Sequence, residues 1–160
     1  ALLMLRDMAY ICIMSRLLAQ INIAHLKAQI DHPSIADFSD NLDKINSIAE
    51  SSDGFVWRLK DEDNNATSFN PYNNELIIVN ISVWQNLETL KNYVYHTDHI
   101  AFFKRSSEWF IPMKQGHMAL WHIEEGAYPD AEEGKKRLDH LNEHGASAFA
   151  FDYRSIEQFS

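Results

Sequence analysis

The chain has 160 residues, of which 46% are apolar and 12% aromatic, and its formal net charge is -9. This length suits one globular domain with its own core, and the lack of repetitive or Gly/Pro-rich tracts argues against disorder. No segment gathers lysine and arginine, so we expect no nucleic-acid partner. The single cysteine, Cys12, cannot form an internal disulfide, which fits a cytoplasmic protein.

The N-terminal stretch ALLMLRDMAYICIM is apolar, but Arg6 and Asp7 interrupt it and it is too short to span a membrane. It also lacks the small-residue cleavage site of a signal peptide. We therefore expect residues 1–13 to be a non-native or upstream extension, residues 14–160 to form one domain, and no membrane partner. An amphipathic helix that docks on a membrane or a partner is the alternative.

Alternation of Gln20 and Asn22 with Ile21 and Ile23 predicts a first strand over residues 17–26. Apolar residues at helical spacing then predict a helix over about 34–50, with Ser34 as its N-cap. Two further strands are predicted over residues 54–60 and 75–84. The long polar connection between them is interpreted as a hairpin loop or a flap over a pocket.

In the second half, a helix is predicted from Asn86 through Val94, a break near 96–98, and a second helix from Asp98 to Phe110. Residues 117–125 predict a strand, 130–145 a helix that ends at Gly145, and 148–153 a short strand or edge piece. The order β–α–β–β–α–β predicts an α+β, ferredoxin-like protomer. Such a sheet carries helices on one face, so we expect a second copy to cover the other face in a homodimer.

Strand parity separates the two faces of this sheet. One face of the 75–84 strand is wholly apolar and suited to pack under helices. The opposite face of three strands mixes polar groups with large apolar ones, which predicts a small-molecule pocket on a helix-free face. A dimer interface whose polar groups satisfy one another is the alternative. Parity does not decide where Trp57 points, and Arg58 is either an anion ligand in the pocket or a salt-bridge partner.

The segment VYHTDHIAFF carries His96 and His99, three residues apart. This spacing can serve a metal, but zinc or non-haem iron needs further ligands, and none follows in a recognisable motif. We therefore predict no metal site. His99 lines up with Phe102 and Phe103 at helical spacing, so it is either a packed histidine or a pocket residue.

Nucleophile and phosphate-binding motifs are absent from the sequence. There is no Gly-x-Ser-x-Gly elbow and no glycine-rich phosphate loop among only five glycines. An enzyme on this scaffold would rely on proton transfer and hydrogen bonding, or on a bound cofactor such as haem.

Four blocks, LAQINIA, GFVWRLKDEDNNAT, NISVWQNLETLKNYVYHTDHIAFFKRSSEWF and HMALWHIEEGAYPDAEEGKKRLDHL, resemble in order and spacing a bacterial family, domain of unknown function 3291. The resemblance covers roughly residues 14–153 and places the chain in the dimeric α/β-barrel superfamily. The segment HTDHIAFF is also similar, more loosely, to the helix motif of antibiotic-biosynthesis monooxygenase-like domains.

The resemblance implies a ferredoxin-like protomer whose sheets pair into a homodimeric barrel. The superfamily includes cofactor-independent oxygenases, haem-degrading enzymes, isomerases and dehydratases, so it fixes no single activity. It implies pocket positions for Asn80 and Trp84 and matches His96 and His99 to the helix histidines.

The resulting hypothesis is a homodimer that acts, without a cofactor, as a monooxygenase-like enzyme on a small hydrophobic or aromatic molecule. The alternatives are a non-catalytic ligand carrier or sensor, and haem binding through one of the two histidines. The predicted catalytic residues are His99, His96 and Asn80, and the predicted substrate-binding residues are Trp84, Asn22, Trp57, Phe103 and His122.

Overall fold

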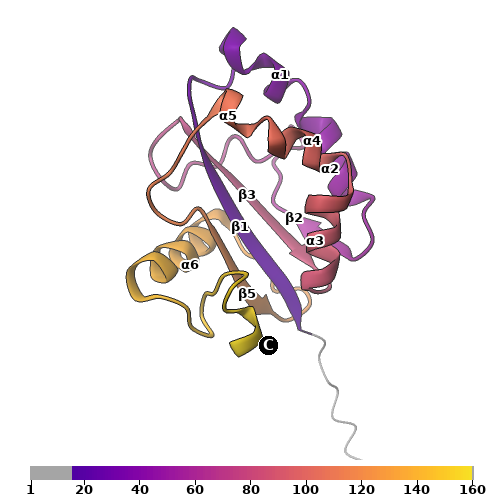
Figure 1. Ribbon diagram of the computed structural model, residues 1–160, viewed down its shortest axis with the longest axis vertical. Coiled ribbons are helices and arrows are strands. Elements are labelled where there is room, and N and C mark those ends of the chain that lie inside the picture. Colours follow the sequence, from indigo (N-terminus) through magenta and orange to yellow (C-terminus); the bar gives the residue numbers. More distant parts are fainter. Residues whose placement is uncertain (1–15, 160) are drawn as a thin grey trace, which may run out of the picture.

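The computed structural model describes residues 16–159, which form one sheet with helices on both of its faces (Figure 1). The prediction for residues 1–13 lies outside these residues. The strands are β1 (Leu17–Leu26), β2 (Phe55–Arg58), β3 (Ile77–Trp84), β4 (Phe110–Ile111) and β5 (Met118–Ile123). The α-helices are α1 (Ala36–Ser39), α2 (Leu42–Glu50), α3 (Leu87–His96), α4 (His99–Lys104), α5 (Ser106–Trp109) and α6 (Ala131–His144), with 3-10 turns η1 (Pro33–Ile35) and η2 (Ile156–Gln158).

The sheet has the order β2-β3-β1-β5, and each neighbouring pair is antiparallel. The short β4 extends it beside the end of β1. Together with the element order, this is the ferredoxin-like arrangement of an α+β protein, so the predicted fold class is confirmed. The register aligns Asn22 of β1 with Asn80 of β3 and Met118 of β5, which puts these three residues in one row across the sheet.

Several predicted boundaries hold and others change. Strand β1 has the predicted bounds, and α3 begins after Asn86, whose side chain accepts from Thr89 N in a capping box. The predicted helix over 34–50 is wrong as one element, because it divides into η1, α1 and α2. The cap before η1 is His32, whose Nδ1 accepts from Ser34 N, and not Ser34 itself. In 148–153, pairing is limited to the bridge between Phe151 and Leu120.

The apolar face of the sheet is buried under α6 and the connection between β2 and β3. Gly134 of α6 sits so close that a Cβ there would lie 2.6 Å from Cδ1 of Ile81 and 3.0 Å from Cδ1 of Ile21. The connection adds Phe69 and Tyr72 to the same cluster. The long loop therefore packs on the core at these positions and shields its apolar face from water.

The opposite, polar face carries α1 to α5 and the C-terminal segment, in two apolar clusters. Leu18 and Trp84 lie at one end of β1 and β3 with α2, α3 and the segment after residue 150. Leu26 and Ile78 lie at the other end with α1, α2, α4 and α5. The expectation that this face is free of helices is wrong: α6, a helix outside the βαββαβ unit, covers the apolar face, and the others pack here. The homodimer was predicted because one face of the sheet was expected to lack helices. Since helices pack on both faces, this reason no longer applies, and the homodimer stays a prediction.

None of the helices within residues 16–159 has the length and apolar character that crossing a bilayer requires.

Candidate functional site

Three side-chain amides lie on the polar face between its two apolar clusters. Asn80 is exposed although both of its strand neighbours, Val79 and Ile81, are buried, and Asn22 opposite it is half-buried. Gln20, two residues before Asn22 in β1 and therefore on the same face, is buried. None of these three amides makes a side-chain hydrogen bond to any residue of the described part of the chain, so their donors and acceptors are available to a ligand or to water.

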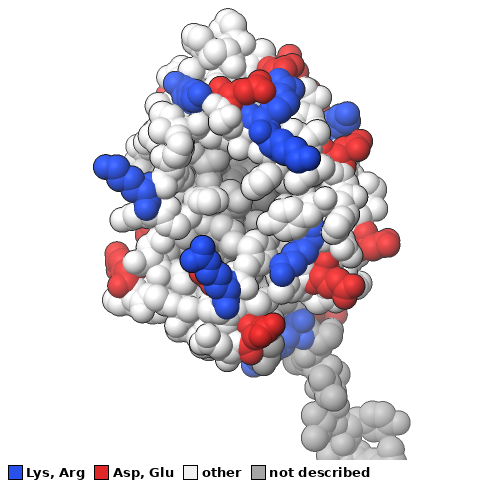
Figure 2. All heavy atoms as spheres, viewed as in Figure 1, with Lys and Arg blue, Asp and Glu red and all other residues white. Residues whose placement is uncertain are grey.

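The surface is hollowed at this place. Figure 2 shows a depression in the middle of the molecule, over β1 and β3 as Figure 1 places them, with α4 and α5 at its upper side. The helices pack at the two ends of the face, as the clusters around Trp84 and Trp109 show, and they leave its centre open. A concave surface with apolar walls and a few convergent polar groups is the usual form of a small-molecule site.

Aromatic side chains build the wall on the α3 side. The Trp84 ring is fully buried and stacks on the Tyr93 ring with centroids 5.0 Å apart, while Phe55 meets Trp84 edge-on at 5.5 Å. The indole Nε1 of Trp84 donates to Ser82 Oγ at 2.9 Å, which leaves the Ser82 proton for Gln20 or a ligand. Burial raises the pKa of Tyr93, so its phenol stays protonated and can donate.

His99 continues this wall as the first residue of α4. Its ring lies 4.7 Å from the Tyr93 ring, and its Nδ1 lies 3.2 Å from the carbonyl oxygen of Val94. Because a carbonyl can only accept, Nδ1 carries the proton and Nε2 keeps its lone pair. Burial lowers the pKa of His99, against the opposite effect of the Val94 carbonyl. The ring is therefore a neutral base whose Nε2 has no partner within residues 16–159.

His96 ends α3 and is exposed, and Thr97 and Asp98 separate it from α4, as the predicted break requires. The two histidines thus lie on different helices. At the outer edge of the same helices, Phe103 is 52% exposed and meets Tyr95 edge-on at 6.4 Å. Both rings are exposed to solvent and form an apolar patch on α3 and α4.

Two of the predicted substrate-binding residues lie elsewhere. Trp57 pairs with Val83 and lies on the opposite, α6-facing side of the sheet, where it stacks on Tyr128 at 5.2 Å. His122 shares the polar face but lies at the far end of it, against the Phe151 ring at 5.3 Å. Asn22 and Asn80 face each other across β1 and β3, Trp84 lies two same-face positions further along β3, and Tyr93 links Trp84 to His99. These residues all lie on the face opposite to Trp57.

Arg58 faces the polar side but serves as a structural anchor. It is 4% exposed, its Nε donates to Glu50 at 2.8 Å, and its Nη2 donates to the Asn64 backbone and side chain. Of the two roles open from the sequence, the salt bridge is the one observed. Sequence reasoning assigned no role to Ser82 and Tyr93. The parity of β3 could have indicated Ser82, whereas Tyr93 needed the packing of α3 to be known.

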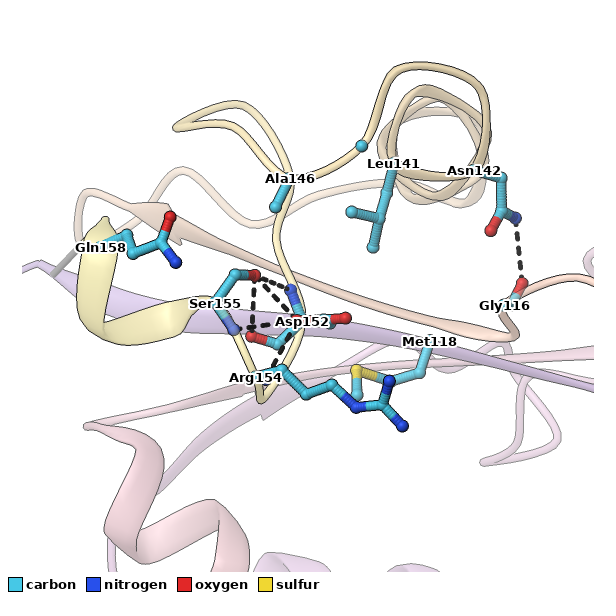
Figure 3. Close-up of a pocket in the computed structure, with 10 residues that line it drawn as sticks. Gly116, Met118, Leu141, Asn142, Ala146, Asp152, Arg154, Ser155 and Gln158 are labelled. Carbon is cyan, nitrogen blue, oxygen red and sulfur yellow. Dashed lines mark hydrogen bonds between the residues drawn. The ribbon is translucent and has the colours of Figure 1, made fainter.

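A groove lies beside the hollow, where Met118 ends the row that begins with Asn80 and Asn22 (Figure 3). It runs between the end of α6, the start of β5 and the C-terminal segment, and its volume is about 450 Å³. Its lining combines apolar and polar side chains, among them Met118, Leu141, Ala146, Asn142, Arg154 and Gln158.

Within residues 16–159, no three His, Cys, Asp or Glu side chains gather in a way that could hold a metal ion. Haem would need an open axial imidazole nitrogen, which Nε2 of His99 offers and which exposed His96 also offers. The fit of the porphyrin itself is a separate requirement, and haem binding stays a prediction.

Residues 17–159 match the family described as Domain of unknown function (DUF3291). The chain belongs to this family. The match covers the whole of the described domain except its first residue, so the resemblance drawn from the sequence blocks is confirmed. A search of the curated proteins finds no match to this DUF3291 chain.

Solved structures match this DUF3291 chain at low identity and with TM-scores below 0.5. SnoaB from Streptomyces nogalater, a cofactor-independent oxygenase, is 11% identical, covers 71% of this chain and 99% of its own, and gives a TM-score of 0.47. PA3566 from Pseudomonas aeruginosa is 14% identical, with 71% and 98% covered and a TM-score of 0.45. NE2512 from Nitrosomonas europaea, a protein of unknown function, is 11% identical, with 72% and 95% covered and a TM-score of 0.46.

Proposed function

We propose that the protein binds a small, largely aromatic molecule with oxygen substituents in the hollow over β1 and β3. The observation that carries this proposal is a group of three amides between two aromatic clusters, none of which makes a side-chain hydrogen bond within residues 16–159. These amides are Gln20, Asn22 and Asn80. The amide of Gln20 is buried, where a missing partner costs stability, and those of Asn22 and Asn80 reach the surface, so a hydroxyl or carbonyl oxygen of a ligand can pair with them. The half-buried ring of Tyr93, which stacks on the buried ring of Trp84, favours a flat apolar ligand body.

The chemistry we propose for this site is a cofactor-independent, monooxygenase-like reaction. Nε2 of His99 would take a proton from an acidic position of the ligand, and the amides of Asn80 and Asn22 would hold the resulting oxyanion. With molecular oxygen as the oxidant, one oxygen atom would enter the ligand as a carbonyl, and the other would leave as water with two ligand hydrogens. His96 is exposed, so we assign it a role at the entrance of the hollow and assign the role of the base to His99.

A ligand carrier or sensor is the second candidate, and it needs only the hollow. A carrier or sensor releases its ligand chemically unchanged, whereas the enzyme converts it. Native mass spectrometry of protein purified from its host would show a retained ligand in either case. Oxygen uptake and incorporation of one atom of ¹⁸O₂ would show conversion, and their absence with a tightly bound ligand would favour the carrier.

Binding is tested by isothermal titration with hydroxylated naphthalenes. We expect Asn80→Ala and Asn22→Ala to weaken binding roughly tenfold, since each removes one hydrogen bond of about 1.4 kcal/mol. Asn92→Ala is the matched control, because Asn92 is an exposed amide on α3. Unchanged affinity in both hollow variants, with wild-type binding intact, would place the ligand elsewhere.

A further inference from the structure

The groove beside the hollow contains the guanidinium of Arg154, which forms no ion pair within residues 16–159. Three other arginines form ion pairs: Arg58 with Glu50, Arg105 with Asp37 and Glu108, and Arg137 with Glu133. The side chain of Arg154 makes no ion pair or hydrogen bond to any residue between 16 and 159. Figure 3 shows it extended alongside Met118, on the wall of the groove.

The carboxylate nearest in sequence to Arg154, that of Asp152, forms no ion pair with the guanidinium, because its oxygen is engaged in the turn. Against the effect of burial, hydrogen bonds from Ser155 and the charge of Arg154 lower the pKa of this carboxyl, so it stays ionised. Oδ1 of Asp152 accepts from Ser155 Oγ at 2.8 Å, and from the backbone N–H groups of Ser155 and Arg154 at 3.0 Å each. Ser155 is itself buried, so this turn is anchored in the C-terminal segment. The turn thus fixes the backbone of Arg154 beside the groove, and its guanidinium donors have no hydrogen-bond partner within residues 16–159.

The groove and the hollow meet at Met118. Its partner in the register is Asn22, and Asn22 faces Asn80. Strands lie about 4.8 Å apart, so this row spans roughly 10 Å, the length of a two-ring aromatic molecule. A ligand on the row would reach from the amides at one end to the groove at the other, with the Met118 thioether under its ring.

We propose that this ligand is an aromatic carboxylate whose acid group pairs with Arg154. The inference rests on the proposed function, because it places the ring in the hollow. A guanidinium offers a carboxylate two parallel donors, and a planar acid fits this fork well. Lys and Arg side chains lie above and below the hollow in Figure 2, while Asp and Glu lie mostly toward the margin of that face. In a chain with a net charge of -9, this local arrangement gives an anion a favourable approach.

The test compares naphthalene-2-carboxylate with naphthalene-2-carboxamide, which share a shape and differ in charge, by isothermal titration at low salt. We expect the carboxylate to bind at least tenfold tighter to the wild-type protein. The advantage should vanish in Arg154→Gln and shrink in 0.5 M NaCl, where pairing of exposed charges is screened, a salt effect on the order of several-fold. Lys44→Gln, an equal loss of charge on exposed α2, should keep the advantage.

The outcomes separate this inference from the proposed function. Equal binding of the two compounds, weakened alike by Asn80→Ala and not by Arg154→Gln, overturns the carboxylate and leaves the hollow as the site. A carboxylate preference that survives in Arg154→Gln also overturns the role of this residue. If neither compound binds, and the hydroxylated naphthalenes fail as well, the proposed function falls and the inference with it.

Discussion

Nδ1 of His99 lies 3.2 Å from the carbonyl oxygen of Val94, five residues earlier in the chain. The contact spans the break between α3 and α4, so the end of one helix orients the first side chain of the next. It also decides which ring nitrogen can accept a proton. The position of this base therefore depends on the helix break and not only on the spacing of two histidines.

His99 is expected to titrate below pH 6.5, with Nε2 unprotonated in the neutral form. Burial lowers its pKa because the charged ring loses hydration. A two-dimensional ¹H–¹⁵N NMR titration gives both the midpoint and the tautomer, with His99→Gln to assign the signal. A midpoint at or above 6.5, or a protonated Nε2 at neutral pH, would contradict the assignment of this nitrogen as the base.

The same pKa shift gives a pH dependence to stability. The unfolded chain takes up a proton at His99 near pH 6.5, whereas the folded state resists it until lower pH. The contribution of this residue is therefore fully present above pH 6.5 and is lost as the pH falls toward the folded-state pKa.

Trp84 is expected to support both the fold and the site. Its ring is fully buried and stacks on Tyr93, so Trp84→Ala should cost roughly 3–5 kcal/mol in urea unfolding. Trp84→Phe keeps the stack but loses the bond to Ser82, for about 1–2 kcal/mol. Ligand affinity should fall in Trp84→Phe and not in Trp57→Phe, because Trp57 lies on the other face. Equal effects of the two Trp→Phe changes on ligand affinity would show that Trp84 does not support the binding site.

The element order and strand β1 followed from the sequence because they depend on local information. Alternation along residues 17–26 separates an apolar face, which α6 covers, from a polar face, which the helices cover only at its two ends. The prediction of one helix over 34–50 was wrong because local hydrogen bonding interrupts the helix near residue 40. The side chain of Asn41 donates to the Asp37 carbonyl at 2.8 Å, and the chain turns at Asp40 and Asn41 before α2 begins.

The assignment of faces failed because parity says which residues share a face, but not what covers it. The apolar face of β3 looked suited to the helices of the βαββαβ unit, yet α6 covers it. Asn22 and Asn80 were correctly grouped, since both alternate with buried isoleucine or valine. Tyr93 stacks on Trp84, and Arg154 lines the groove, through packing of segments that are distant in the sequence. Periodicity in a single sequence carries no information on such packing.

Replacement of His122 by phenylalanine is expected to stabilise the protein, most strongly in acid. Neither ring nitrogen has a hydrogen-bond partner in the described chain, and the ring lies on Phe151. Burial, followed by the charge of Arg16, lowers the pKa of His122, and the backbone of Leu17 opposes this without a well-formed hydrogen bond.

A lowered folded-state pKa means that the unfolded state binds the proton first, so wild-type stability falls as the pH drops below 6.5. His122→Phe should gain roughly 1 kcal/mol at pH 7.5, because two unsatisfied polar atoms are removed. The gain should be larger at pH 5.5, measured by urea unfolding at the two values. His117→Phe, at an exposed position where the histidine side chain has no hydrogen bond within residues 16–159, is the control. A gain that is equal at both pH values would show that His122 does not titrate differently in the folded state.

Gly134→Ala is expected to destabilise the protein although alanine is the better helix former. A Cβ at this position would lie 2.6 Å from Cδ1 of Ile81, so α6 must move away from the sheet or Ile81 must leave its rotamer. We expect a loss of about 1–3 kcal/mol in urea unfolding, against a propensity gain of roughly 1 kcal/mol. Ile81→Val removes Cδ1, so the double variant should lose less than the sum of the two single changes, by about 1 kcal/mol or more. Additive losses would mean that this close approach does not position α6 over the apolar face.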